Sequence, residues 1–130
     1  YDGALPSANS VQCVNLLRLY GITDDDKIGS MAEEQLKAFS GSVEKFPAGS
    51  AYFLMGICLQ EKQFEVIKIF GNKTDSKVKE MIEICSKGFH PNRLIINKEN
   101  IEEIKAQVCS DFKCSADIYT VEELEKYLKS

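Results

Sequence analysis

The fold is decided by the stretch Phe64-Glu65-Val66-Ile67-Lys68-Ile69-Phe70-Gly71. Its β-branched and aromatic side chains predict a strand that ends at Gly71. Apolar residues at helical spacing follow, and Gly88 is expected to close that helix. A second strand is expected at residues 93–97, directly after a turn. Strand, helix and strand at this spacing predict a βαβ unit with two parallel strands and a right-handed crossover.

The C-terminal residues extend this unit. We expect a short helix at 101–104 and a third strand at 107–109. A capping box at 120–123 opens a last helix. Residues 47–130 are therefore expected to form a small α/β domain. It is built on a small, mainly parallel sheet of about three strands with flanking helices.

Helical spacing dominates the N-terminal third of the chain. Residues 8–20 predict a helix capped by Ser7 and stopped by Gly21, and Thr23 is expected to cap a second helix. Because the link is short, the two helices should form an antiparallel hairpin over residues 1–46, packed on the sheet. Such a pair cannot bury both of its faces alone, so it needs a partner, in this chain or outside it.

Residues 48–59 are nearly all apolar or small, and Pro47 suits the first position of a helix. A helix that is apolar on most sides is expected to be buried on most sides. We therefore place it between the hairpin and the α/β layer.

Composition excludes several classes of partner. The 130 residues carry 16 Lys and Arg against 20 Asp and Glu, a formal net charge of −4. The basic side chains are interleaved with acidic ones, which argues against nucleic acid as a partner. No apolar run approaches membrane-spanning length, and residues 1–10 lack the order of a signal peptide. We expect a cytoplasmic protein with no membrane partner.

The chain has five cysteines: Cys13, Cys58, Cys85, Cys109 and Cys114. The first three fall on apolar faces of predicted helices, as reduced, buried thiols of a cytoplasmic protein do. Four residues separate Cys109 from Cys114, a spacing that suits a disulfide, a redox pair or half a metal site. No second pair completes a tetrahedral zinc site, so we expect no metal and no cofactor. Structural or incidental cysteines are the simpler interpretation.

The first ten residues are polar turn formers that run directly into a helix. Gly3, Pro6 and Asn9 suit a backbone that bends sharply. A polar loop held ahead of a helix can be part of an active-site rim, whereas the simpler interpretation is a well-capped helix entry. From these residues alone, no catalytic constellation is present.

The segment Asp2-Gly3-Ala4-x-Pro6-Ser7-x-Asn9-Ser10, followed by a leucine-rich helix, resembles a signature of a family of thioredoxin-domain-containing proteins. The vertebrate member of this family is called a spermatogenesis-associated protein. The resemblance covers the chain in order, through the glycine-ended strand, the Phe89-His90-Pro91 turn, and Cys109 and Cys114 before a final amphipathic helix. This chain departs from the family at Ala8, where glycine is frequent, and in lacking a proline at residues 115–117.

The family is similar, in its middle, to N-acylglucosamine 2-epimerases and six-hairpin glycosidases. The resemblance implies a thioredoxin-like domain, an (α/α)6 toroid and a short α/β end. Residues 1–46 would be the last helices of the toroid and residues 47–130 the C-terminal domain, with the upstream domains as partners. The opening loop would face the toroid cavity through Asp2, Ser7, Asn9 and Ser10. Asp2 would be its only group for acid/base work.

Three functions follow as hypotheses. The first is a non-catalytic C-terminal segment that completes the toroid and contributes a cavity-lining loop. The second is a sugar-processing site, epimerase-like or glycosidase-like, in which Asp2 acts on a sugar-like ligand. The third is a thiol or metal module built on Cys109 and Cys114. In isolation, the exposed side of the hairpin is also expected to favour self-association.

Overall fold

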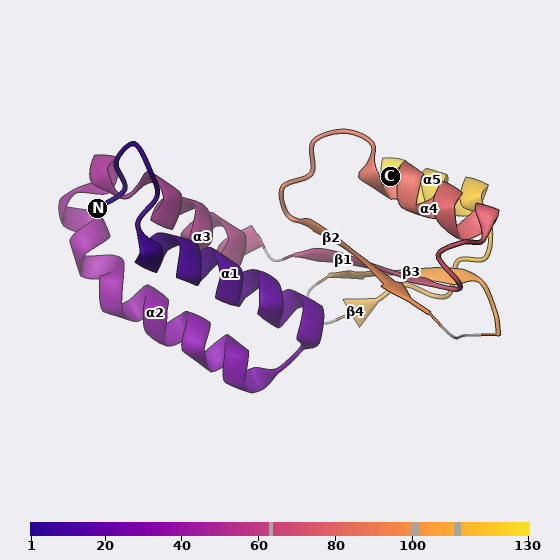
Figure 1. The fold of residues 1–130 in the computed structure, drawn as a ribbon, viewed down its shortest axis with the longest axis horizontal. Coiled ribbons are helices and arrows are strands. Elements are labelled where there is room, and N and C mark those ends of the chain that lie inside the picture. Colours follow the sequence, from indigo (N-terminus) through magenta and orange to yellow (C-terminus); the bar gives the residue numbers. More distant parts are fainter. Residues whose placement is uncertain (63, 100–101, 111–112) are drawn as a thin grey trace. The chain divides into compact units, whose positions relative to one another are not determined.

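The computed structural model describes residues 1–62, 64–99, 102–110 and 113–130. Within them the chain forms five α-helices, one 3-10 helix and four strands (Figure 1). The chain divides into two compact units, Tyr1–Phe64 and Glu65–Ser130, here named the helical unit and the sheet unit. The predicted α/β class, with an N-terminal helical hairpin and a small sheet, is confirmed.

The helical unit contains three α-helices and a short 3-10 turn: α1 (Ala8–Thr23), α2 (Asp26–Lys45), η1 (Pro47–Gly49) and α3 (Ala51–Lys62). Ser7 caps α1, as predicted. The predicted stop at Gly21 is wrong, because α1 continues to Thr23 and the chain turns at Asp24, whose φ of 53° is left-handed. Asp25, and not Thr23, therefore caps α2.

The core of the helical unit forms where α1 packs on α2 and α3. Its buried residues are Cys13, Val14, Leu16, Leu17, Ala32, Leu36, Val43, Phe53 and Leu59. Helix α3 approaches α1 closely, since a Cβ added at Gly56 would lie 3.0 Å from the Cys13 sulfur. The prediction that α3 is buried on most sides is wrong for one side, where Met55 is 45% exposed and Cys58 is also exposed.

The sheet unit contains β1 (Glu65–Phe70), α4 (Ser76–Ser86), β2 (Arg93–Lys98), β3 (Lys105–Ser110), β4 (Lys113–Cys114) and α5 (Val121–Lys129). The strand order is β2-β1-β3-β4. Strands β1 and β2 are parallel, as predicted, with α4 between them in the chain. Strand β3 runs antiparallel to β1 and to β4, so the sheet is mixed rather than mainly parallel.

The direction of β3 has a simple cause. Only residues 99–104 separate β2 from β3, whereas a parallel connection needs a crossover of a dozen or more residues. The short helix expected over 101–104 is wrong for its described part, since 102–104 are not helical and 101 lies outside the described residues.

Helices α4 and α5 contact each other and lie over one face of the sheet (Figure 1). The buried residues of this core are Ile67, Ile69, Val78, Met81, Cys85, Ala106, Val108, Ile118 and Leu124. Arg93 joins the layers: its side chain, only 8% exposed, pairs with the Glu65 carboxylate and donates a hydrogen bond to the Cys85 carbonyl. Glu65 and Arg93 are register partners, so this ion pair secures the parallel alignment of β1 and β2.

Along the chain, the boundary between the two units falls after Phe64, because α3 packs on α1 and so belongs to the helical unit. The assignment of residues 1–46 to a toroid and 47–130 to a C-terminal domain stays a prediction. Among the described helices, none has the length and apolar character needed to cross a membrane.

Candidate functional site

The Asp2 side chain fastens the N-terminal loop to two helices at once. Its Oδ1 accepts a hydrogen bond from the Ser7 backbone N–H at 2.7 Å. Its Oδ2 accepts from the backbone N–H groups of Tyr52 and Phe53 at 2.9 and 3.1 Å. The Asp2 N–H donates to the Gly49 carbonyl at 2.7 Å. We name this arrangement the Asp2 junction.

The Asp2 junction caps α3 from a distance of about fifty residues along the chain. The first N–H groups of a helix have no partner inside the helix, and the helix dipole favours a negative charge beside them. The Asp2 carboxylate supplies both the acceptor and the charge. It therefore acts as the N-terminal cap of α3 and binds the entry of α1 through Ser7.

Ser7 and Ser10 belong to the same junction. The Ser7 Oγ accepts from the Ser10 N–H at 3.2 Å, the two hydroxyls lie 2.8 Å apart, and Ser10 is only 3% exposed. Asn9 lies elsewhere: its side-chain and backbone oxygens accept from the Gln35 amide of α2. The structure thus brings Asp2, Ser7 and Ser10 together and leaves Asn9 on the hairpin. That the four residues line a cavity stays a prediction.

The aromatic contacts beside the Asp2 junction were not predicted from the sequence. Tyr1 and Phe46 stack at a centroid distance of 6.1 Å, next to Gly49. A Cβ at Gly49 would lie 2.3 Å from the Phe46 ring and 2.8 Å from the Tyr1 ring, so this close approach needs glycine. The small residues at 48–50 could have indicated a close approach to the backbone there, but no local pattern connects them with Asp2.

The pKa of the Asp2 carboxyl is lowered from 3.8 to about 2. Desolvation is the largest influence and raises the pKa. Hydrogen bonds from the Ser7 N–H, the Ser10 hydroxyl, the Phe53 N–H and the Ser7 hydroxyl together outweigh it. The carboxylate is therefore ionised and occupied by donors at neutral pH, which makes it a poor general acid.

This lowered pKa predicts an acid-sensitive junction. A carboxyl group whose pKa is lower in the folded state stabilises that state above its unfolded pKa of 3.8, and the stabilisation disappears as the pH falls towards 2. We expect the free energy of unfolding of the helical unit to decrease over this window. The measurement is urea unfolding of the wild-type chain and an Asp2→Asn variant at several pH values. The gap between them should close on acidification, and a constant gap would contradict the prediction.

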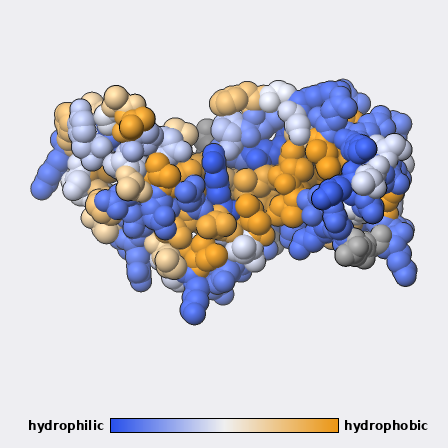
Figure 2. Space-filling model, in the orientation of Figure 1, coloured by the Kyte–Doolittle hydropathy of each residue, from blue (hydrophilic) through white to orange (hydrophobic). Residues whose placement is uncertain are grey.

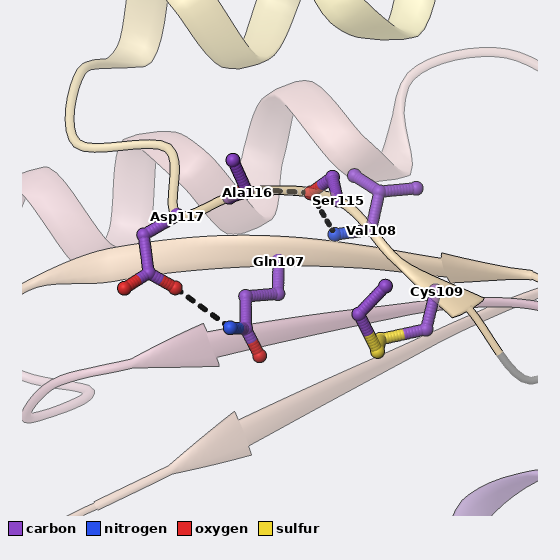
Figure 3. The surroundings of a disulfide bond; sticks show 7 residues. Gln107, Val108, Cys109, Ser115, Ala116 and Asp117 are labelled. Carbon is purple, nitrogen blue, oxygen red and sulfur yellow. Dashed lines mark hydrogen bonds between the residues drawn. A yellow bond between two sulfur atoms is a disulfide. The ribbon is translucent and has the colours of Figure 1, made fainter.

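The second candidate site is the Cys109–Cys114 pair, which forms a disulfide (Figure 3). The two residues are direct register partners on β3 and β4. Cys109 is 8% exposed, whereas Cys114 is exposed. Among the described residues, no group of three or more His, Cys, Asp or Glu side chains is arranged to hold a metal ion.

The remaining cysteines are free thiols. Cys13 and Cys85 are buried, as predicted, and burial raises both pKa values, that of Cys85 to about 11. For Cys85, the nearby Arg93 lowers the pKa and Glu65 raises it, but desolvation dominates. The expected burial of Cys58 is wrong, because it lies on the exposed side of α3.

The chain segment after the disulfide returns along β3 (Figure 3). The Ser115 N–H donates to the Val108 carbonyl at 2.8 Å, and the Ser115 Oγ accepts from the Val108 N–H at 3.1 Å. Asp117 accepts from the Gln107 amide at 2.6 Å and from the Lys105 ammonium at 2.8 Å. Hydrogen bonds from Lys105 and then Gln107 lower the pKa of Asp117. These groups are mutually satisfied, which is typical of a structural network.

No protein-family model and no solved structure matches the chain. The chain is similar to spermatogenesis-associated protein 20 from human, with 27% identity over 98% of the chain. The rat protein of the same name is 30% identical over 73% of the chain. These matches cover 19% and 12% of the relatives, so the chain spans about a fifth or less of their length.

Proposed function

From the premise that homologues of this chain are named spermatogenesis-associated protein 20, we propose that it is a non-catalytic C-terminal segment of a longer cytoplasmic protein. The helical unit completes a toroid of helical hairpins, and the Asp2 junction holds its opening loop in place. The partners of the segment are the remaining toroid helices and a thioredoxin-like domain of the same polypeptide.

The observation that carries this proposal is an exposed stripe on α3. Ala51, Met55 and Cys58 are exposed at spacings of four and three residues, so they share one side of the helix. The stripe carries no charged side chain, whereas a helix side that faces water is normally polar. A further layer of helices would bury it, and the relatives are several times longer than this chain.

The Asp2 junction also favours a structural role over a sugar-processing one. Glycoside hydrolysis needs two carboxyl groups that flank the reacting bond. The Asp2 carboxylate instead accepts hydrogen bonds from the backbone N–H groups of Ser7, Tyr52 and Phe53. A ligand would have to displace these donors, at the expense of the cap of α3.

A charge placed on the α3 stripe tests the proposal. In the isolated chain, Met55→Glu replaces a side chain that is 45% exposed. We expect it to change the free energy of unfolding by less than about 0.5 kcal/mol. In the full-length protein the same charge would be buried against the toroid, and the melting temperature and soluble yield should fall clearly.

A matched control is Glu44→Gln, an exposed position on α2, which should leave both proteins unchanged. Differential scanning fluorimetry of the four variants makes the comparison. Equal, small effects of Met55→Glu in both proteins would contradict the proposal, because the stripe would then face water in the longer protein too.

A further inference from the structure

The two cysteine residues of the disulfide differ in exposure. Cys114 is exposed in β4, which is only two residues long, whereas Cys109 lies in the longer strand β3 and is 8% exposed. In thiol–disulfide exchange, a thiolate attacks one sulfur and the other sulfur leaves. The sulfur that an attacking thiolate can reach is the one attacked, and this is expected to be the sulfur of the exposed residue Cys114.

The chain around the disulfide is held by bonds that do not depend on it. The Ile118 N–H donates to the Ala106 carbonyl at 2.9 Å, and the Ala106 N–H donates to the Ile118 carbonyl at 2.8 Å. Both residues are buried in the core of the sheet unit. Asp117, the residue before Ile118, accepts a hydrogen bond from the Lys105 ammonium and one from the Gln107 amide, the second of which is drawn in Figure 3. Opening the disulfide would therefore leave this attachment, and hence the core, in place.

We propose that Cys109 and Cys114 form a thiol–disulfide exchange site that accepts electrons from a dithiol. A thiolate of the dithiol bonds to the Cys114 sulfur, the bond between the two cysteines breaks, and its electron pair passes to the Cys109 sulfur, which takes a proton from water. The second thiolate of the reductant then attacks the mixed disulfide. Cys114 leaves as a thiolate and is protonated. The protein gains two electrons and two protons, and the dithiol becomes a disulfide.

The first experiment measures reduction of the folded chain by dithiothreitol. The full chain carrying Cys58→Ser is used, so that the exposed free thiol gives no background. After incubation without denaturant, the reaction is quenched with acid, and the protein is unfolded, labelled with N-ethylmaleimide and weighed intact. The oxidised chain should carry two labels, on Cys13 and Cys85, and the reduced chain four.

We expect millimolar dithiothreitol to convert two labels into four within minutes, with an unchanged far-ultraviolet circular dichroism spectrum. Oxidised dithiothreitol should reverse the conversion. Reduction that requires denaturant would overturn the proposal, because the disulfide would then be inaccessible to a dithiol in the folded protein. Four labels before any reductant is added would also overturn it.

The second experiment tests the direction of attack. In Cys109→Ser the remaining thiol is the exposed Cys114, and in Cys114→Ser it is the protected Cys109. With Cys58→Ser in both, we expect Cys114 to react with an aromatic disulfide reagent roughly 10-fold faster than Cys109, because thiol reactivity follows access. Circular dichroism checks that both variants fold. Equal rates, or a faster Cys109, would overturn the assignment of Cys114 as the attacked sulfur.

Discussion

Replacing Gly71 by Ala is expected to lower the free energy of unfolding of the sheet unit by about 2–4 kcal/mol. Gly71 directly follows β1 and has a φ of 140°, a conformation that L side chains rarely adopt. An added Cβ would lie 2.7 Å from Val78 and 3.1 Å from Ile104. Val78 is fully buried and cannot move aside. Backbone strain and overpacking therefore act together.

The matched control for this prediction is Gly41→Ala. Gly41 lies inside α2, and a Cβ there would meet nothing within 4 Å. Alanine is the better helix former, so the free energy of unfolding of this variant should increase by about 0.5–1 kcal/mol. Chemical unfolding followed by circular dichroism gives both values. An unchanged or increased free energy of unfolding in Gly71→Ala would contradict the strain assigned to Gly71.

Replacing Asp2 by Asn is expected to lower the free energy of unfolding of the helical unit by about 2 kcal/mol. Both carboxylate oxygens accept backbone N–H groups, from Ser7 on one side and from Tyr52 and Phe53 on the other. The amide nitrogen of Asn would face a donor on one of these sides. The variant also removes the negative charge from the N-terminus of α3.

The measurement is urea unfolding at neutral pH, with Asn9→Ala as the control. Asn9 lies close by in the sequence, is exposed, and takes no part in the Asp2 junction. Its replacement should therefore lower the free energy of unfolding much less than Asp2→Asn does. A stable Asp2→Asn variant would show that the junction does not hold the loop. If the full-length Asp2→Asn protein kept its melting temperature but lost turnover of a sugar, the sugar-processing alternative would be favoured instead.

Local patterns predicted the elements of this protein well. The helical hairpin, the Ser7 cap, and the parallel pairing of β1 and β2 around α4 all follow from spacing and turn residues within short windows. The errors in α1 and α2 are shifts of boundary, since Gly21 stays helical once the core holds α1. The same patterns could not show that one side of α3 is exposed.

The candidate sites were only half visible in the sequence. Asp2, Ser7 and Ser10 stood out as polar residues ahead of a helix, but their partners at 49–53 did not. For Cys109 and Cys114 the spacing left a disulfide, a redox pair and a metal site open. The register of β3 and β4 places the two cysteines opposite each other as a disulfide.

The sequence by itself therefore determined the helices, the βαβ unit and the caps made by neighbouring residues, because these depend on periodicity and on side chains a few positions apart. Only the tertiary structure decided the role of Asp2, the pairing of β3 with β1 rather than with β2, and the accessibility of Cys58 and Cys114. Each of these depends on which segments meet after the chain has folded. A cap from a carboxylate about fifty residues away leaves no local pattern, because its donors are backbone N–H groups that every helix start offers.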